Sequence, residues 1–209
     1  MTAKIKLNAD SGGGSVSIQA PSSSSNNRVI SLPDTADGTI LTTTNPKAGN
    51  IVQVVHTVNN SYASVDSTKN TFITSLSFGC QITPSSISNI IILYYSITLS
   101  AEVDGRQLTL TPTFNTGSGV TQITTAIGNA GGSRTRVNSS DCVMNKQTAT
   151  TINFNCKHSP NSVSQHTYGF QHTIQHDGGW VVRNGGFTDT DNADYSRYSS
   201  SITAMEVAV

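Results

Sequence analysis

The stretch from Asn89 to Val103, N-I-I-I-L-Y-Y-S-I-T-L-S-A-E-V, is the feature that most constrains the fold. Side chains of a β-strand alternate between two faces, so this stretch divides by parity. The odd positions are apolar throughout: Ile91, Leu93, Tyr95, Ile97, Leu99, Ala101 and Val103. The even positions begin apolar, with Ile90, Ile92 and Tyr94, and end polar, with Ser96, Thr98, Ser100 and Glu102. A helix is disfavoured because β-branched residues and a period of two dominate.

The division predicts a long strand with one face buried along its whole length. We expect the other face to be buried at its apolar start and solvent-exposed at its polar end. A second sheet would cover the first face, and a subunit contact would cover Ile90, Ile92 and Tyr94. The stretch therefore predicts a β-sandwich that associates with another chain.

The composition argues against several functional classes. Only 11% of the 209 residues are charged, against roughly a quarter in ordinary globular proteins. The net charge is zero, so we expect neither nucleic-acid binding nor attraction to an anionic membrane. The longest apolar run, Ile90–Tyr95, is far shorter than a membrane span, and Met1–Lys6 lacks the apolar core of a signal peptide. Cys80, Cys142 and Cys156 lack metal-ligand spacing and predict reduced thiols in a protein folded in a cytoplasm.

Residues 1–48 have the pattern of a thin, separate arm. Strand-like pieces are separated by glycine-, serine- and proline-rich breakers and fall at Lys4–Leu7, Ser15–Ala20, Arg28–Leu32 and Thr39–Thr42. Each piece has too few large apolar residues to offset the entropy of ordering the backbone. We expect an arm that orders against a partner or intertwines with copies of itself; a disordered tail is the alternative. The candidate docking residues are Ile5, Leu7, Val16, Ile18, Val29 and Leu32.

Residues 49–209, after a linker at Asn45–Asn50, predict a larger domain of antiparallel strands. Besides the stretch above, strands are expected at Val52–Val58, Phe72–Ile82, Leu108–Phe114, Ile152–Cys156, Tyr168–Ile174, Trp180–Val182 and Ile202–Val209. Asp104-Gly105 predicts a hairpin that places an antiparallel neighbour beside the central strand. About eight short strands without a helical period predict a jelly-roll-like sandwich. The strand order stays open.

A resemblance to a known family lies at both ends and in the middle of the chain. The N-terminal part resembles the start of tail-fibre-like virion proteins of tailed bacteriophages, especially marine and cyanobacterial ones, in K-I-K-L-N (4–8), V-S-I-Q-A-P (16–21) and V-I-S-L-P-D-T-A-D-G-T-I-L-T-T (29–43). Three further segments resemble the C-terminal domain of the same group: I-T-P-S-S-x-S-x-I-I-I (82–92), G-S-R-T-R-V (132–137) and D-T-D-N-A-D-Y-S-R-Y-S-S-S-I-T-A-M-E-V (189–207). Residues 143–165 match no part of it. The resemblance implies a homotrimeric virion appendage with a docking N-terminal part and a C-terminal knob.

Possible metal sites have simpler explanations. Asp189, Asp191 and Asp194 lack the glycine and the glutamate of an EF-hand loop and predict a solvated acidic loop. Three further candidates share one strand parity: His166, His172 and His176. Neighbours among them lie roughly 20 and 13 Å apart along a strand, too far to ligate one metal. We expect structural or surface histidines, with His172 buried and hydrogen-bonded, and no metal or cofactor.

Catalytic signatures are absent from the sequence. It contains no G-x-S-x-G, no P-loop and no G-x-G-x-x-G. A polysaccharide-cleaving site built on Asp189 and Asp191 is the enzymatic alternative, since glycosidases use paired carboxylates. No catalytic residue is therefore assigned.

Three aromatic residues are candidate receptor-binding or interface residues: Trp180, Tyr195 and Tyr198. A flat ring with a polar tip can stack on a sugar or anchor a protein interface. Core packing is the alternative for Trp180.

The predicted function is that of a non-enzymatic structural protein of a phage virion, assembled in the host cytoplasm. A trimeric tail fibre or fibre-like appendage would attach through residues 1–48 and present the knob to the host surface, gaining avidity from its copies. The expected partners are copies of itself, virion proteins of the tail, neck or head, and a host-surface glycan or receptor, without nucleic acid or membrane insertion. A capsid decoration or head fibre bound to the major capsid protein is the first alternative, and a polysaccharide-degrading tail enzyme is the second.

Overall fold

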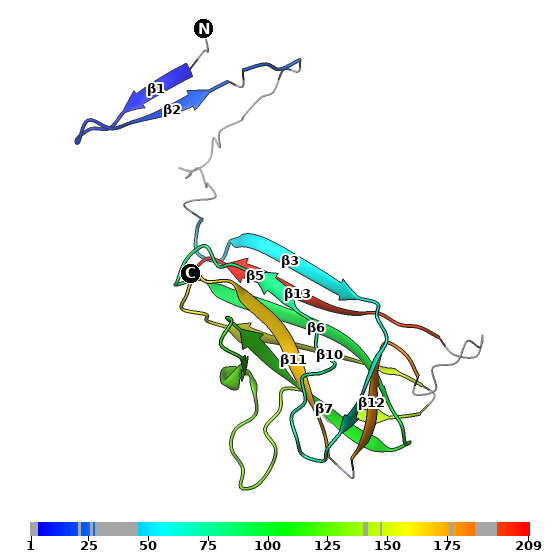
Figure 1. The fold of residues 1–209 in the computed structure, drawn as a ribbon. Coiled ribbons are helices and arrows are strands. Elements are labelled where there is room, and N and C mark those ends of the chain that lie inside the picture. The colour runs from blue at the N-terminus through cyan, green and yellow to red at the C-terminus, as the bar shows by residue number, and fades with distance from the viewer. Residues whose placement is uncertain are drawn as a thin grey trace, which may run out of the picture. The chain divides into compact units, whose positions relative to one another are not determined.

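The computed structural model of the chain describes residues 4–20, 22–25, 27, 46–139, 142–146, 148–175, 178–186 and 196–209. The chain divides into two compact units, Met1–Ile40 and Leu41–Val209 (Figure 1). The described ranges contain no helix that could span a membrane.

The first unit contains an antiparallel two-stranded ribbon of β1 (Lys4–Asn8) and β2 (Ser15–Gln19). Its turn has positive φ angles of 82° and 69° at Gly12 and Gly13, a conformation that glycine adopts without strain. These strands occupy the first two positions that the alternation predicts. The pieces expected at Arg28–Leu32 and Thr39–Thr42, with Val29 and Leu32, lie outside the described residues.

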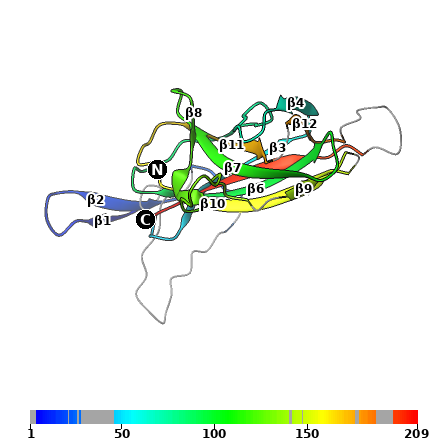
Figure 2. The same cartoon turned by 90° about the horizontal axis from the view of Figure 1, so that it is seen from below.

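The second unit is a sandwich of two antiparallel sheets (Figures 1 and 2). The larger sheet contains, in order, β3 (Ile51–Asn59), β13 (Ser200–Val207), β6 (Ile90–Ala101), β12 (Gly179–Arg183) and β4 (Ala63–Ser67), with β10 (Thr150–His158) also on β6. The smaller sheet contains, in order, β5 (Cys80–Ile82), β11 (His166–Ile174), β7 (Arg106–Asn115) and β8 (Val120–Gln122), with β9 (Cys142–Met144) also on β7. A 3-10 turn, η1 (Thr124–Ala126), follows β8.

Eight of these strands pair as a nested series. In chain order the first pairs with the last, β3 with β13, and the next pairs are β5 with β11, β6 with β10 and β7 with β8. This nesting gives the four-strand orders β3-β13-β6-β10 and β5-β11-β7-β8, which are those of a jelly roll. The predicted antiparallel, jelly-roll-like fold is confirmed.

The odd positions within β6 are buried as predicted, but Val103 lies beyond the end of the strand and is 45% exposed, so its predicted burial was wrong. Every odd position from Ile91 to Ala101 is at most 2% exposed. The ring of Tyr95 stacks on Phe154 of β10 with 4.4 Å between the ring centroids. The odd face of β6 therefore forms the centre of the core.

The even face of β6 differs from the expectation. Ile90 and Ile92 are only half-buried and Tyr94 is 48% exposed, whereas Thr98 and Ser100 are buried. The polar end is covered because the Ser100 hydroxyl donates to the carbonyl of Gly185 at 2.8 Å and Thr98 donates to that of Ser199 at 3.2 Å. In the single chain the polar end of this face is therefore buried and the apolar start is partly exposed, so the predicted solvent exposure of the polar end was wrong.

The Asp104-Gly105 turn does not make a hairpin with β6. It leads into β7, which belongs to the smaller sheet and pairs with β11, β8 and β9. One edge of β6 is occupied by β10 and the other by β13 and then β12, so no edge remains for β7. The turn, with φ of 82° at Gly105, is a corner between the two sheets.

One further strand prediction was wrong, and three short strands were missed. The expected strand at Phe72–Ile82 is regular only over β5, because the chain before it is held by the Arg183 guanidinium, which donates to the carbonyl of Leu76, and by a backbone pair of Ile73 with His172. The short strands β4, β8 and β9 were not anticipated.

Candidate functional site

The outer face of the larger sheet contains the predicted contact residues of β6. The strand register places Ile92 between Lys157 of β10 and Met205 of β13. Two further rows follow along β6. Tyr94 lies between Asn155 and Thr203, and Ser96 lies between Asn153 and Ser201.

One part of this face is apolar. We call it the apolar strip, and it consists of Val54, Ile90, Ile92, Met205 and Val207. Val54 on the edge strand β3 is 55% exposed, and the other four are half-buried. Burying such side chains is favourable, so an exposed row of them marks an interaction surface.

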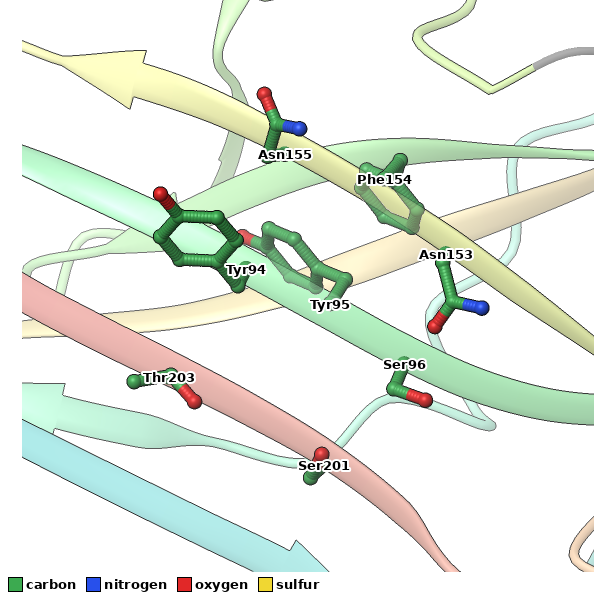
Figure 3. A pocket seen from close by; sticks show the side chains of 8 residues that line it. All are labelled: Tyr94, Tyr95, Ser96, Asn153, Phe154, Asn155, Ser201 and Thr203. Carbon is green, nitrogen blue, oxygen red and sulfur yellow. The ribbon is translucent and has the colours of Figure 1, made fainter.

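The adjoining part of the face is polar and forms a shallow hollow of 260 Å³ (Figure 3). We call it the polar platform, and its side chains are Tyr94, Ser96, Asn153, Asn155, Ser201 and Thr203. Tyr95 and Phe154 complete the lining, and none of the lining residues is charged. The platform therefore offers an aromatic ring, two carboxamides and three hydroxyls on three adjacent strands (Figure 3).

The four apolar residues predicted to dock in the N-terminal arm share one face of the ribbon. Ile5 pairs with Ile18 and Leu7 with Val16. All four are between 52% and 69% exposed. A two-stranded ribbon has no second layer of its own, so this face has no core within the ribbon.

The three predicted aromatic residues do not form one described site. Trp180 on β12 is 41% exposed, so it is a surface residue rather than a core residue. Tyr198 is half-buried, and its backbone N–H donates to the carbonyl of Asn184 at 3.2 Å. No ring contact joins these two within the described ranges, and Tyr195 lies outside them.

The histidines on β11 are structural. His172 is fully buried and its Nε2 bonds the hydroxyl of Ser67 at 2.8 Å, as expected. Burial lowers the pKa of His172 to about 4. Since Ser67 is also buried, this Ser–His pair is closed to a substrate. His166 is buried with its Nδ1 2.8 Å from the carbonyl of Ser164, and His176 lies outside the described residues.

His158 at the end of β10 was missed at the sequence level. Its Nδ1 is 2.8 Å from the Tyr168 hydroxyl, and its ring lies 4.6 Å from that of Phe114 and 5.9 Å from that of His166. Burial, and then the charge of His166, lowers the pKa of His158 to about 4. The signal was present, because His158 continues the inward parity of Phe154 and Cys156.

A second, larger cleft of 680 Å³ lies where β10 ends near η1. Its lining includes Phe114, Thr121, Gln122, Thr124, Lys157, His158 and Asn161. Lys157 is the one charged side chain among its lining residues, so no pair of carboxylates meets there.

Metal and thiol chemistry have no described site. Within the described ranges, no group of three or more His, Cys, Asp or Glu side chains could hold a metal ion. Asp189, Asp191 and Asp194 lie outside those ranges. The three cysteines are free thiols, and burial raises their pKa, that of Cys156 to about 12. Protonated thiols are poor nucleophiles and poor metal ligands.

Neither a protein-family model nor a curated protein matches the chain. Among solved structures, the chain is similar to one of infectious bursal disease virus, Gx strain, with 14% identity and a TM-score of 0.36 over 94% of this chain and 43% of that one. T=1 particles derived from infectious bursal virus give 12% identity and a TM-score of 0.39 over 93% and 49%. The VP2 subviral particle of infectious bursal disease virus gives 14% identity and a TM-score of 0.37, and the match covers 92% of this chain and 50% of that one. The chain spans half or less of these solved chains, and at these scores the likeness carries no functional argument.

Proposed function

We propose that the chain is a non-enzymatic structural protein of a phage particle, a homotrimeric tail fibre or fibre-like appendage. Residues 1–48 attach it to the particle, and residues 49–209 present the sandwich to the host surface. The resemblance of both ends of the sequence to tail-fibre-like proteins supports the proposal. Jelly rolls occur in viral capsid and lectin domains, which agrees with it, although a fold alone does not determine a function.

The observation that carries the proposal is the apolar face of the ribbon. Ile5, Ile18, Leu7 and Val16 form two cross-strand pairs with no second layer in the ribbon. A lone two-stranded ribbon is marginally stable in water, so covering this face stabilises both the ribbon and its complex. A docking arm on a virion protein has this property.

The apolar strip supports self-association of the knob. Ile92 and Met205 are neighbours across strands in the middle of this partly exposed row. Sister copies that bury the strip would gain the hydrophobic stabilisation that the single chain lacks. Contacts with the host that are weak individually would then add through several copies.

The docking role is tested by particle incorporation of full-length variants. Leu7→Asp and Ile18→Asp place charge on the apolar face of the ribbon, and Ser17→Asp, on its opposite face, is the matched control. Each is supplied during infection by phage that lacks the gene, and purified particles are assayed for the protein. We expect the first two to be soluble but absent from particles, and the control to be incorporated. Normal incorporation of Leu7→Asp and Ile18→Asp would refute the docking role.

Sedimentation of the full-length protein tests the homotrimer. Ile92→Asp in the apolar strip should dissociate it, whereas Thr121→Asp, at an exposed strand position of the smaller sheet, should not. A wild-type chain that sediments as a monomer would contradict the self-association. A capsid decoration or head fibre would use the same ribbon, and cryo-EM of the particle distinguishes that alternative by locating the protein on tail, neck or head.

A further inference from the structure

We infer that the polar platform is a binding site for a neutral saccharide. Its side chains keep most of their hydrogen-bonding capacity unused. Thr203 bonds Nδ1 of His56 at 2.8 Å, but Tyr94, Ser96, Asn153, Asn155 and Ser201 have no side-chain partner in the part of the chain that the structure describes. One row further along β6, by contrast, the hydroxyls of Thr98 and Thr151 bond each other at 2.9 Å.

The chemistry of the platform matches a sugar ring. A carboxamide offers donors and an acceptor side by side, so Asn153 and Asn155 can each bond neighbouring sugar hydroxyls. Serine and threonine hydroxyls both donate and accept. The 48% exposed ring of Tyr94 supplies an apolar face for the C–H side of a pyranose, with a polar tip beside it.

The arrangement is rigid and of suitable size. The six side chains form two rows on three hydrogen-bonded strands, as Figure 3 shows. Such a grid measures about 10 Å across the strands and 7 Å along them, which fits one or two sugar rings. The hydrogen-bonded strands fix the backbone positions from which these side chains project, so a ligand binds without rearranging the backbone.

The absence of charge selects the class of sugar. No Asp, Glu, Lys or Arg lines the platform, and the nearest such residue in the register, Lys157, lies one row beyond Asn155 beside Ile92. An acidic sugar would find no cation within the platform. A protein partner is disfavoured, because the centres of protein interfaces are more apolar than this surface, whereas the adjacent apolar strip has that character.

This inference rests on the adhesive part of the proposed function, but its test does not depend on assembly. Saturation-transfer NMR on the full-length protein would use glucose, galactose, mannose and N-acetylglucosamine as probes, with glucuronate as the charged comparison. We expect transfer to at least one neutral sugar. Asn155→Ala and Tyr94→Ala should each weaken that binding about tenfold or more. Thr121→Ala, on an exposed strand position of the smaller sheet, should leave it unchanged.

Several results would overturn the inference. These are no transfer to any neutral sugar, transfer to glucuronate alone, and binding that survives both platform variants. An Asn155→Ala protein that loses self-association would identify the platform as a protein interface instead. Ile92→Asp separates the two proposals. Sugar binding retained by this variant supports the platform even if the trimer fails. Binding seen in this variant alone would overturn the inference, because the assembled protein would not present the platform.

Discussion

A single buried carboxylate holds the turn that precedes β6. Glu206 of β13 is fully buried and accepts hydrogen bonds from Gln53 at 2.5 Å, from the backbone and hydroxyl of Ser85 at 2.7 and 2.8 Å, and from Asn89 at 2.6 Å. Burial alone would raise its pKa, but bonds from Asn89, Gln53 and Ser85 outweigh burial and lower it. The carboxylate thus fastens the turn before β6 to the end of β13.

We predict that Glu206→Gln destabilises the fold by about 1–3 kcal/mol. The NH2 group of the new amide would face hydrogen-bond donors of Gln53, Ser85 and Asn89 and could not accept bonds from them. The folded-state pKa lies below the ordinary value of 4.5, so this stabilisation is present above pH 4.5 and is lost as the pH falls through the folded value. Urea unfolding at neutral pH and below pH 4.5 measures both effects. The half-buried Glu102→Gln is the control, and equal stabilities of the two variants would contradict the role of Glu206.

Asn184 directly follows β12. It lies at the point where the pairing of one edge of β6 changes from β13 to β12. It is fully buried with φ of 61°, its N–H donates to the carbonyl of Thr98 at 3.1 Å, and its amide donates to that of Asn59 at 2.7 Å. Its side-chain oxygen accepts a bond from the hydroxyl of Ser200 at 2.6 Å. One residue therefore links the end of β12 to β3, β6 and β13, and no sequence pattern singled it out.

Two substitutions separate the backbone and side-chain roles of Asn184. Asn184→Gly keeps the positive φ and loses the amide bonds, which should cost about 1–3 kcal/mol. Asn184→Ala should cost about 1–2 kcal/mol more, because a Cβ is disfavoured in the left-handed region. Thermal or urea unfolding measures the stabilities of the wild type and the two variants, which should decrease from wild type to Asn184→Gly to Asn184→Ala. An alanine variant more stable than the glycine variant would disprove the backbone argument.

At the scale of elements, β6 shows that strand alternation predicts the burial of one face but not of the other. Its odd face was predicted residue by residue because period-two patterning is local. The burial of its even face depended on segments distant in the chain, which cover Thr98 and Ser100 and leave Ile92 half-exposed. Likewise, the Asp104-Gly105 signal identified a turn but could not distinguish a hairpin from a corner between sheets, because both need the same local backbone.

Alanine substitutions on the two faces of β6 should have different consequences. Leu93→Ala removes a fully buried side chain from the core and should destabilise the chain by about 2–5 kcal/mol. Ile92→Ala, on the outer face, should cost the single chain less than about 1 kcal/mol and act mainly on self-association. Unfolding at low protein concentration together with sedimentation separates the effects. A large loss of single-chain stability from Ile92→Ala would show that its own chain covers it.

For the whole molecule, two neutral histidines tie the sheets of the sandwich together. His158 of β10 bonds Tyr168 of β11, and His172 of β11 bonds Ser67 of β4. Each bond joins the larger sheet to the smaller one. Burial disfavours the charged ring, so these ties depend on the histidines remaining neutral.

Acid should therefore loosen the sandwich. The pKa of both histidines is lowered from 6.5 to about 4, so their contribution is complete above pH 6.5 and is lost as the pH falls from 6.5 toward 4. The melting temperature, followed across this range, should decline with decreasing pH. His158→Gln and His172→Gln should flatten the decline, whereas the exposed His56→Gln should not. An unchanged slope in the first two variants would contradict this account.

The sequence by itself determined the all-β class, the buried face of β6, the ribbon strands and the burial of His172, because strand alternation and turn chemistry are local. Only the tertiary structure decided the nested strand pairs, the corner at Gly105, the partners of Glu206 and Asn184, and the gathering of Tyr94, Asn155 and Thr203 on one surface. The physical reason is that in a jelly roll nearly every strand pairs with one far away in the chain. A strand's own residues specify which face is apolar but not which distant edge it will meet.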